Sequence, residues 1–202
     1  MKNRQRSFLF FEKPPREISI KNGSSLREIK INRSNYELST QLIAVDCMQL
    51  RNLDADLSVY KSLDFTRIAI QELKGLKNLE SVKLNECSEL QSIDASENAK
   101  LQTIDIKSCE KLTTIKGGNS LQTLLADNCA ALTTVDVNNS ENLTKIEVKK
   151  CSALATVDAK SCSKLETINI ENSGVAALNA SNSAKLRTIT GSSLKSVICN
   201  EC

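Results

Sequence analysis

The chain of 202 residues contains no histidine. Without histidine it has neither a Ser-His-Asp triad nor a Cys-His nucleophile pair, and it lacks the commonest protein ligand of transition metals. Most familiar enzyme classes therefore lose their key residue. We predict a protein with no catalytic residues, no cofactor and no metal site.

Aromatic residues make up only 3% of the chain, and none lies beyond Phe65. Because Trp, Tyr and Arg supply most binding hot spots, the candidate binding face defined below, which has none of these residues, lacks the usual anchors. We expect any binding by that part of the chain to depend on polar side chains.

Long apolar runs and a one-sided charge are also missing. The run Phe8–Phe11 is too short for the apolar region of a secretory signal or for a membrane span. The 27 basic and 24 acidic residues are spread along the chain and leave a net charge of +3. A nucleic-acid partner normally requires a concentrated basic face. We therefore predict no nucleic-acid binding, no membrane insertion and no classical signal peptide.

The chain does contain an internal repeat. From Leu79 to Cys202 it divides into short units, mostly of eleven residues, such as LQTIDIKSCEK and LATVDAKSCSK. In an extended strand, positions four and six of a unit face one side, and positions three and five face the other. One strand cannot bury its apolar row alone, so successive coils must stack. The repeat predicts a parallel β solenoid.

The sixth position alternates between large and small residues, as Leu84 and Ile106 alternate with Ala95 and Gly117. The true repeat is therefore a pair of units, about 22 residues long, which lies in the range of solenoid repeats. We assign the halves with large residues to regular strands on a concave face. The other halves should form short extended or 3₁₀ segments, with a tightened turn at the glycines 117–118.

The pattern L-x-x-L-x-L-x-x-[N/C] at this spacing resembles the leucine-rich repeat family. The cysteines at position nine resemble the bacterial internalin-type subgroup with a cysteine ladder. The segment LDFTRIAIQELKGLKNLESVKL fits the same spacing. The resemblance implies one continuous domain over 17–202, with degenerate opening coils at 17–62 and the repeat solenoid at 63–202. Residues 1–16 are expected to form an N-terminal tail or cover.

Six of the eight cysteines fall on position nine: Cys87, Cys109, Cys129, Cys151, Cys162 and Cys202. Buried cysteine behaves as a small hydrophobe with a weak S–H donor. Parallel side chains on successive coils give poor torsions for a disulfide. We predict a reduced structural ladder at Cys87, Cys109, Cys129 and Cys151.

Two other patterns admit a chemical alternative. Cys199-x-x-Cys202 lacks the second pair or the histidines of a zinc site, so we interpret its cysteines as packing residues, with a terminal redox pair or metal half-site as the alternative. Asp94, Asp136 and Asp158 recur at position five of the alternate halves. Such a row could bind calcium, but Lys116 on the same row favours a solvated surface.

The family resemblance implies a protein-recognition module that binds a protein partner through the outward residues of the repeat strands. The candidate partner-binding face consists of Thr103, Asp105, Thr123, Leu125, Lys145, Glu147, Thr167, Asn169 and Thr188. The alternatives are a structural solenoid that self-associates through its C-terminal edge, and the repeat portion of a bacterial effector docked by its N-terminal segment. Free thiols suit a reducing cytoplasm, whereas the internalin-like character suggests a secreted or surface protein.

Overall fold

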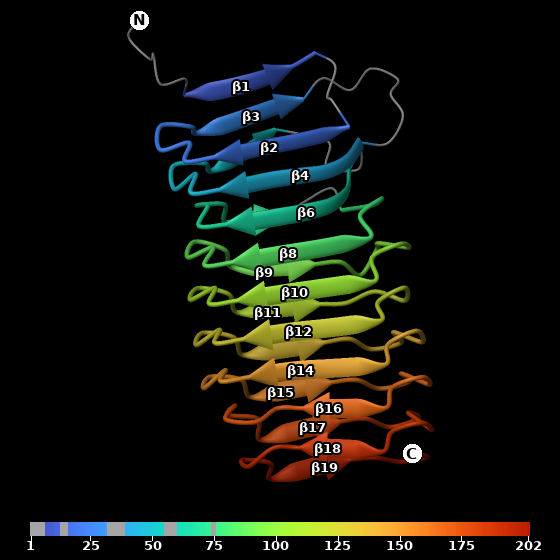
Figure 1. Ribbon diagram of the computed structural model, residues 1–202. Coiled ribbons are helices and arrows are strands. Elements are labelled where there is room, and N and C mark those ends of the chain that lie inside the picture. Colours follow the sequence, from blue (N-terminus) through green and yellow to red (C-terminus); the bar gives the residue numbers. More distant parts are fainter. Residues whose placement is uncertain (1–6, 13–15, 32–38, 55–59, 74–75) are drawn as a thin grey trace, which may run out of the picture.

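The computed structural model describes residues 7–12, 16–31, 39–54, 60–73 and 76–202. The described residues form nineteen strands and contain no helix. Successive strands alternate between two sides of a coil, and the coils are stacked along one axis (Figure 1). The predicted parallel β solenoid of leucine-rich-repeat type is confirmed.

One side of the solenoid is a nine-stranded parallel sheet. Its strands are β2 (Glu17–Lys21), β4 (Ser39–Val45), β6 (Tyr60–Thr66), β8 (Ser81–Asn85), β10 (Thr103–Lys107), β12 (Thr123–Asp127), β14 (Lys145–Lys149), β16 (Thr167–Asn169) and β18 (Thr188–Thr190). Within this sheet Ile104 pairs with Val82 on one side and with Leu124 on the other. These three residues hold the same position in successive pairs of units, so one coil corresponds to one pair of units, as predicted.

The other side consists of two shorter parallel sheets. A three-stranded sheet contains β1 (Phe8–Phe11), β3 (Glu28–Ile31) and β5 (Asn52–Asp54). A seven-stranded sheet contains β7 (Glu72–Leu73), β9 (Ser92–Asp94), β11 (Thr114–Lys116), β13 (Thr134–Asp136), β15 (Thr156–Asp158), β17 (Ala177–Asn179) and β19 (Ser196–Ile198). The alternate halves are thus short strands, as expected for extended segments, and no 3₁₀ turn occurs among the described residues.

A single apolar core runs between the two sides. Ile104 and Ile106, at positions four and six of their unit, are completely buried, and so is Leu112 at the start of the next unit. Each such side chain contributes about 1.5–3 kcal/mol through burial. Since the same positions recur in every coil, each coil covers the core of its neighbour. Stacking is therefore the main source of stability.

Position eight of many units has a left-handed backbone although it holds no glycine. Glu86, Ser108, Asn128 and Lys150 have φ angles of 52° to 57°. This conformation costs about 1–2 kcal/mol for most residues. It turns the chain out of the strand and aims the amide at the next coil, as in the 2.9 Å hydrogen bond from Ser108 N to Asp127 O. The bond between coils helps to offset the cost.

Two glycines of the shortened units lie close to the backbone of the preceding coil. A Cβ on Gly118 would lie 2.5 Å from the carbonyl oxygen of Ala95, and one on Gly174 would lie 2.2 Å from that of Ser152. Both contacts are with the backbone of the preceding coil. The shortened units therefore fit the stack because glycine lets the two backbones approach. The turn predicted at 117–118 lies slightly later, at 119–120, and is closed by the 3.0 Å hydrogen bond from Leu121 N to Gly118 O.

Candidate functional site

The nine residues of the predicted partner-binding face form two adjacent rows on the outside of the nine-stranded sheet. The strand register aligns position three of each unit, and separately position five. The first row is Thr103, Thr123, Lys145, Thr167 and Thr188, and the second row is Asp105, Leu125, Glu147 and Asn169. All are half-buried except Thr188, which is exposed. The period of two along each strand keeps them away from the core.

Ion pairs hold the charged residues of this face. Glu147 lies between two lysines, with Lys145 Nζ at 3.0 Å from Oε1 and Lys149 Nζ at 3.5 Å from Oε2. The hydrogen bond from Lys145 lowers the pKa of the Glu147 carboxyl below its ordinary value. Lys83 makes a similar pair with Asp64 at 3.2 Å. Such exposed pairs contribute at most about 1 kcal/mol each, so their main effect is to orient the side chains.

A shallow depression of about 210 Å³ lies on this face, across β10, β12 and β14. Leu125 forms part of it, together with charged residues at positions five and seven: Asp105, Lys107, Asp127, Glu147 and Lys149. Asp105 Oδ1 and Asp127 Oδ1 are buried and accept no hydrogen bond, although Lys107 Nζ lies 3.9 Å from Asp105 Oδ1. The sequence analysis missed the position-seven residues because these strands extend one residue beyond position six.

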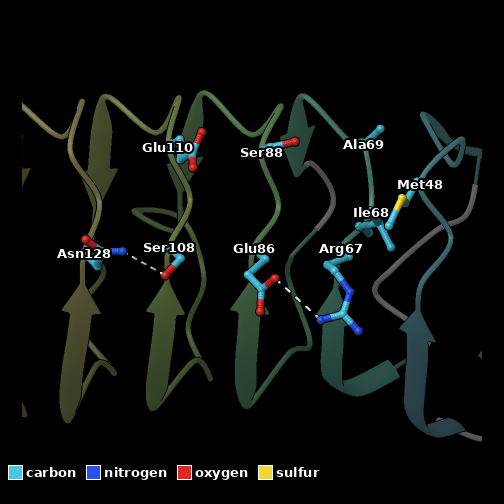
Figure 2. Close-up of a pocket in the computed structure, with 9 residues that line it drawn as sticks. All are labelled: Met48, Arg67, Ile68, Ala69, Glu86, Ser88, Ser108, Glu110 and Asn128. Atoms are coloured by element: carbon cyan, nitrogen blue, oxygen red, sulfur yellow. Dashed lines mark hydrogen bonds and ion pairs between the residues drawn. The ribbon is translucent and has the colours of Figure 1, made fainter.

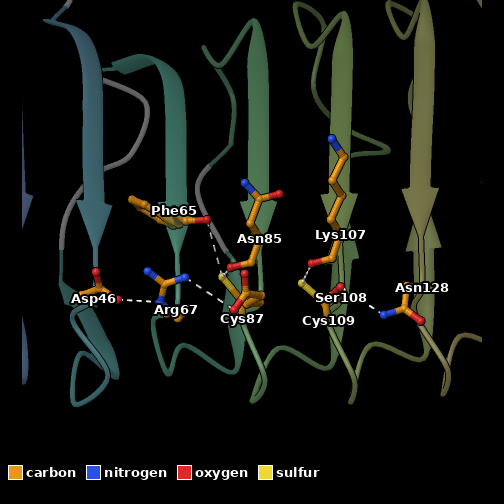
Figure 3. A network of polar contacts seen from close by, with 10 residues as sticks. Asp46, Phe65, Arg67, Asn85, Cys87, Lys107, Ser108, Cys109 and Asn128 are labelled. Carbon is orange, nitrogen blue, oxygen red and sulfur yellow. Dashed lines mark hydrogen bonds and ion pairs between the residues drawn. The ribbon is translucent and has the colours of Figure 1, made fainter.

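A larger groove of about 490 Å³ follows the turns at the carboxyl ends of β4, β6, β8, β10 and β12 (Figure 2). Left-handed residues of these turns interact along the stack: Arg67, in the groove, pairs with Asp46 beside it at 2.5 Å and with Glu86 at 3.5 Å. Asn128 Nδ2 donates to Ser108 Oγ at 3.1 Å (Figure 3). The hydrogen bond from Arg67 lowers the pKa of Asp46. Sequence analysis did not identify this groove, since turn residues of mixed type leave no periodic signal.

The cysteines below these turns are buried inside the coil. Six are free and have no exposed surface: Cys47, Cys87, Cys109, Cys129, Cys151 and Cys162. Their sulfurs contact strand carbonyls, as Cys109 Sγ does at 3.6 Å from Lys107 O (Figure 3). Cys47 occupies the same place, after the left-handed Asp46, and was missed because its unit does not begin with leucine.

The environment of these thiols makes them poor nucleophiles. Burial raises the pKa of the Cys162 thiol to about 12. A hydrogen bond with Cys87, together with burial, raises the pKa of Cys109 well above its ordinary value. A hydrogen bond with Cys109 lowers the pKa of Cys87, and one with Cys151 lowers the pKa of Cys129. The thiolate is the reactive form, so Cys162 and Cys109 are protonated near neutral pH, and burial keeps all six thiols away from dissolved reagents.

The interpretation of Cys199 and Cys202 as packing residues is wrong. The two form a disulfide, with 5.6 Å between their Cα atoms. The argument from parallel side chains concerns cysteines on successive coils. Cys199 and Cys202 instead lie within one turn of one coil, which brings their Cα atoms into disulfide range.

The described residues contain no group of three or more Cys, Asp or Glu side chains that could hold a metal ion. Of the aspartate row on the second side, Asp94 pairs with Lys116 at 3.7 Å, and Asp158 accepts a hydrogen bond from Asn138 Nδ2 at 3.0 Å. Within the described ranges, no helix is long and apolar enough to cross a membrane.

Comparison with known proteins does not identify a family for this chain. No protein-family model and no curated protein matches the chain. Among solved structures, a leucine rich cell surface protein from Faecalibacterium prausnitzii is 14% identical; the match covers 92% of this chain and 79% of that one, with a TM-score of 0.29. That score carries no structural argument, so the assignment rests on the repeat and the strand register. By these criteria the chain is a leucine-rich-repeat-like solenoid of parallel β-sheets.

Proposed function

We propose that the protein is a non-catalytic recognition module that binds a protein partner on the outside of the nine-stranded sheet. The proposed contact residues are the two rows described above, centred on Leu125. Leucine-rich repeat folds generally serve protein interaction, which favours this function over an enzymatic one, but a fold alone does not determine function. The site itself supplies the more specific support.

The depression around Leu125 carries the proposal. A buried acceptor left without a donor costs about 1–3 kcal/mol, and the depression holds two of them, on Asp105 and Asp127. A partner that brings N–H donors to these oxygens, from an arginine or lysine side chain, would recover this cost. Leu125 offers an apolar contact at the centre. The partner should therefore present a basic residue next to an apolar one.

Site-specific photocrosslinking tests this surface on the whole chain. A photoreactive residue at Thr123, on the proposed face, should capture the partner, and one at Thr134, on the opposite sheet, should not. Crosslinks from Phe10 instead of Thr123 would favour docking by the N-terminal segment, where Phe8 and Phe10 are 56% and 57% exposed. Equal capture from Thr123 and Thr134 would contradict the proposal.

A charge-swap pair then measures the contribution of the face. The double variant Lys145→Glu, Glu147→Lys keeps the net charge and should weaken partner binding by about tenfold, or ~1.4 kcal/mol. The matched control is Glu89→Lys, Lys111→Glu, which swaps a 2.8 Å ion pair between neighbouring turns outside the nine-stranded sheet. The control should bind as the native chain does, and an equal loss in both variants would place the contact elsewhere.

Self-association is the second candidate function, and the last coil favours it. Val197 and Ile198 are 45% and 50% exposed on β19, which is the end strand of its sheet. An apolar end strand offers an unpaired edge to a second copy. Light scattering should then show a mass that rises with concentration, and Val197→Lys should abolish the rise. A constant mass over the soluble range would exclude this function.

The finer family assignment stays a prediction. The resemblance to the internalin-type subgroup favours a bacterial secreted or surface protein. Identification of the crosslinked partner would test it directly, because a partner confined to the cytoplasm would contradict it.

A further inference from the structure

The groove beside the turns arises directly from the repeat. At each turn the residue at position nine is buried, whereas those at positions eight and ten point outward, as Ser108 and Glu110 do on either side of Cys109. Because the coils stack in register, the outward residues form two rows, and the groove runs along them across the turns (Figure 2). The position-eight row is Arg67, Glu86, Ser108 and Asn128, and the position-ten row is Met48, Ala69, Ser88 and Glu110.

The length of the groove suits an extended chain. It crosses the turns after β4, β6, β8, β10 and β12, and neighbouring strands of a sheet lie about 4.8 Å apart. Three such steps, about 14 Å, separate Met48 from Glu110 along the position-ten row. An extended peptide advances about 3.3 Å per residue and turns every second side chain to the same face, so side chains four residues apart on it span about 13 Å. One peptide can therefore contact both ends of this row.

The Met48 end of the row is apolar. Met48 is 57% exposed, Ala69 follows it in the row, and the buried Ile68 also lines the groove there. Coils lie on both sides of Met48, since β4 pairs with β2 and with β6, so its exposure does not depend on the ends of the chain. Among the described residues from Glu17 to Asn179, no other large apolar side chain is exposed. Because methionine is enriched at protein interfaces, this side chain supplies an apolar contact for a partner.

The groove also carries an excess of negative charge. Arg67 is the one basic residue among the described residues that line it, and its guanidinium already pairs with Asp46 at 2.5 Å and with Glu86 at 3.5 Å. Glu110, in contrast, is exposed, and its carboxylate has no ion pair or hydrogen bond among the described residues. Three carboxylates thus accompany one guanidinium. A lysine or arginine side chain can therefore pair with Glu110 without displacing an existing partner.

We propose that this groove is a docking site for an extended peptide segment of a partner protein, with an apolar side chain and a lysine or arginine four residues apart. The apolar side chain packs against Met48 and Ala69, and the basic group pairs with Glu110. Ser88 lies between them in the row and is small, so it leaves room for the peptide backbone. The site lies at the turns, beyond the strands that carry the depression around Leu125, and it does not rest on the function proposed for that face.

Methyl NMR of the full chain tests the proposal, because Met48 is one of only two methionines. The protein is isotope-labelled at its methionine methyl groups, and the variant Met48→Leu assigns the signal. It is titrated with two short peptides, Leu-Gly-Ser-Gly-Lys and the reverse order, each blocked at both ends, and with analogues in which glutamate replaces lysine. We expect the better lysine peptide to shift the Met48 signal in a saturable way. It should bind about 2- to 10-fold more tightly than its glutamate analogue, as expected when an exposed ion pair replaces a repulsive contact.

A charge reversal separates this docking from unspecific attraction. In Glu110→Lys the preference should reverse, so that the glutamate peptide binds more tightly by a similar factor. The matched control is Glu141→Lys, at the exposed position ten of a unit on the opposite side of the solenoid, and it should keep the native preference. A Met48 signal that stays unmoved with about 10 mM of either lysine peptide, a concentration that nearly saturates a site with a Kd of about 1 mM, would overturn the proposal. So would a preference that Glu110→Lys leaves unchanged, or one that Glu141→Lys alters to the same extent.

Discussion

The same substitution, serine to cysteine, should have opposite effects at two equivalent positions of the stack. Ser140 and Ser173 both occupy position nine, where other units have a buried cysteine. Ser140 Oγ is buried and has no hydrogen-bond partner. Ser173 Oγ donates to Val148 O at 2.7 Å and accepts from Cys151 N at 3.2 Å. The hydrogen bonding of the two sites therefore differs although their sequence positions match.

The magnitudes follow from these contacts. An unpaired buried hydroxyl costs about 1–3 kcal/mol, so Ser140→Cys should raise the free energy of unfolding by about 1 kcal/mol after allowance for the larger sulfur. Ser173→Cys weakens two hydrogen bonds and should lower it by about 1–2 kcal/mol. Urea unfolding followed by circular dichroism measures both. Two changes of the same sign would refute the view that cysteine serves at position nine as an apolar filler with a weak donor.

Three further predictions concern the backbone and the pH dependence. Gly118→Ala should lower the free energy of unfolding by about 2–3 kcal/mol, because the added Cβ meets the Ala95 carbonyl oxygen. A melting temperature that is unchanged or higher would show that the coils can move apart to make room for the methyl group. Lys150→Val, at a left-handed position, should lower the free energy of unfolding by about 1–2 kcal/mol, whereas Lys149→Val at the end of the preceding strand should lower it less. Equal urea midpoints for the two variants would show that the left-handed backbone at residue 150 is not strained. Hydrogen bonds from Ser96 lower the pKa of Asp94, so the stabilising contribution of Asp94 is present above the ordinary carboxyl pKa and is lost as the pH falls below about 4. The difference in free energy of unfolding between the native chain and Asp94→Ala should therefore shrink between pH 7 and pH 3. A difference that widens would contradict this prediction.

Much of the fold follows from the sequence because one periodic signal determines it. Alternation within LQTIDIKSCEK places Ile104 and Ile106 in the core and Thr103 and Asp105 outside, and the nearly constant unit length aligns these positions between coils. The two rows of the candidate face could be predicted for that reason. The alternation extends to Lys107, which lines the depression, but nothing in the repeat pattern indicates that the strand continues that far.

Features that depend on single contacts were not predictable in the same way. Nothing in the residue types of Glu86 or Lys150 marks a left-handed backbone, since that conformation arises from the hydrogen bond to the next coil. The groove beside these turns was missed for this reason. The disulfide of Cys199 and Cys202 joins positions six and nine of one unit, and the repeat pattern does not indicate this pairing because no other unit has cysteine at both positions.

The protection of the buried thiols tests the stacked core most directly. The native chain is treated with iodoacetamide without reductant at increasing urea concentrations, and modified cysteines are mapped by mass spectrometry while circular dichroism follows the sheets. In the absence of urea, the six free cysteines should remain unmodified, and they should react only over the urea range in which the β signal is lost. Rapid alkylation of Cys109 or Cys129 in the native state, or their recovery in a disulfide or bound to a metal ion, would show that the coils do not enclose a common core.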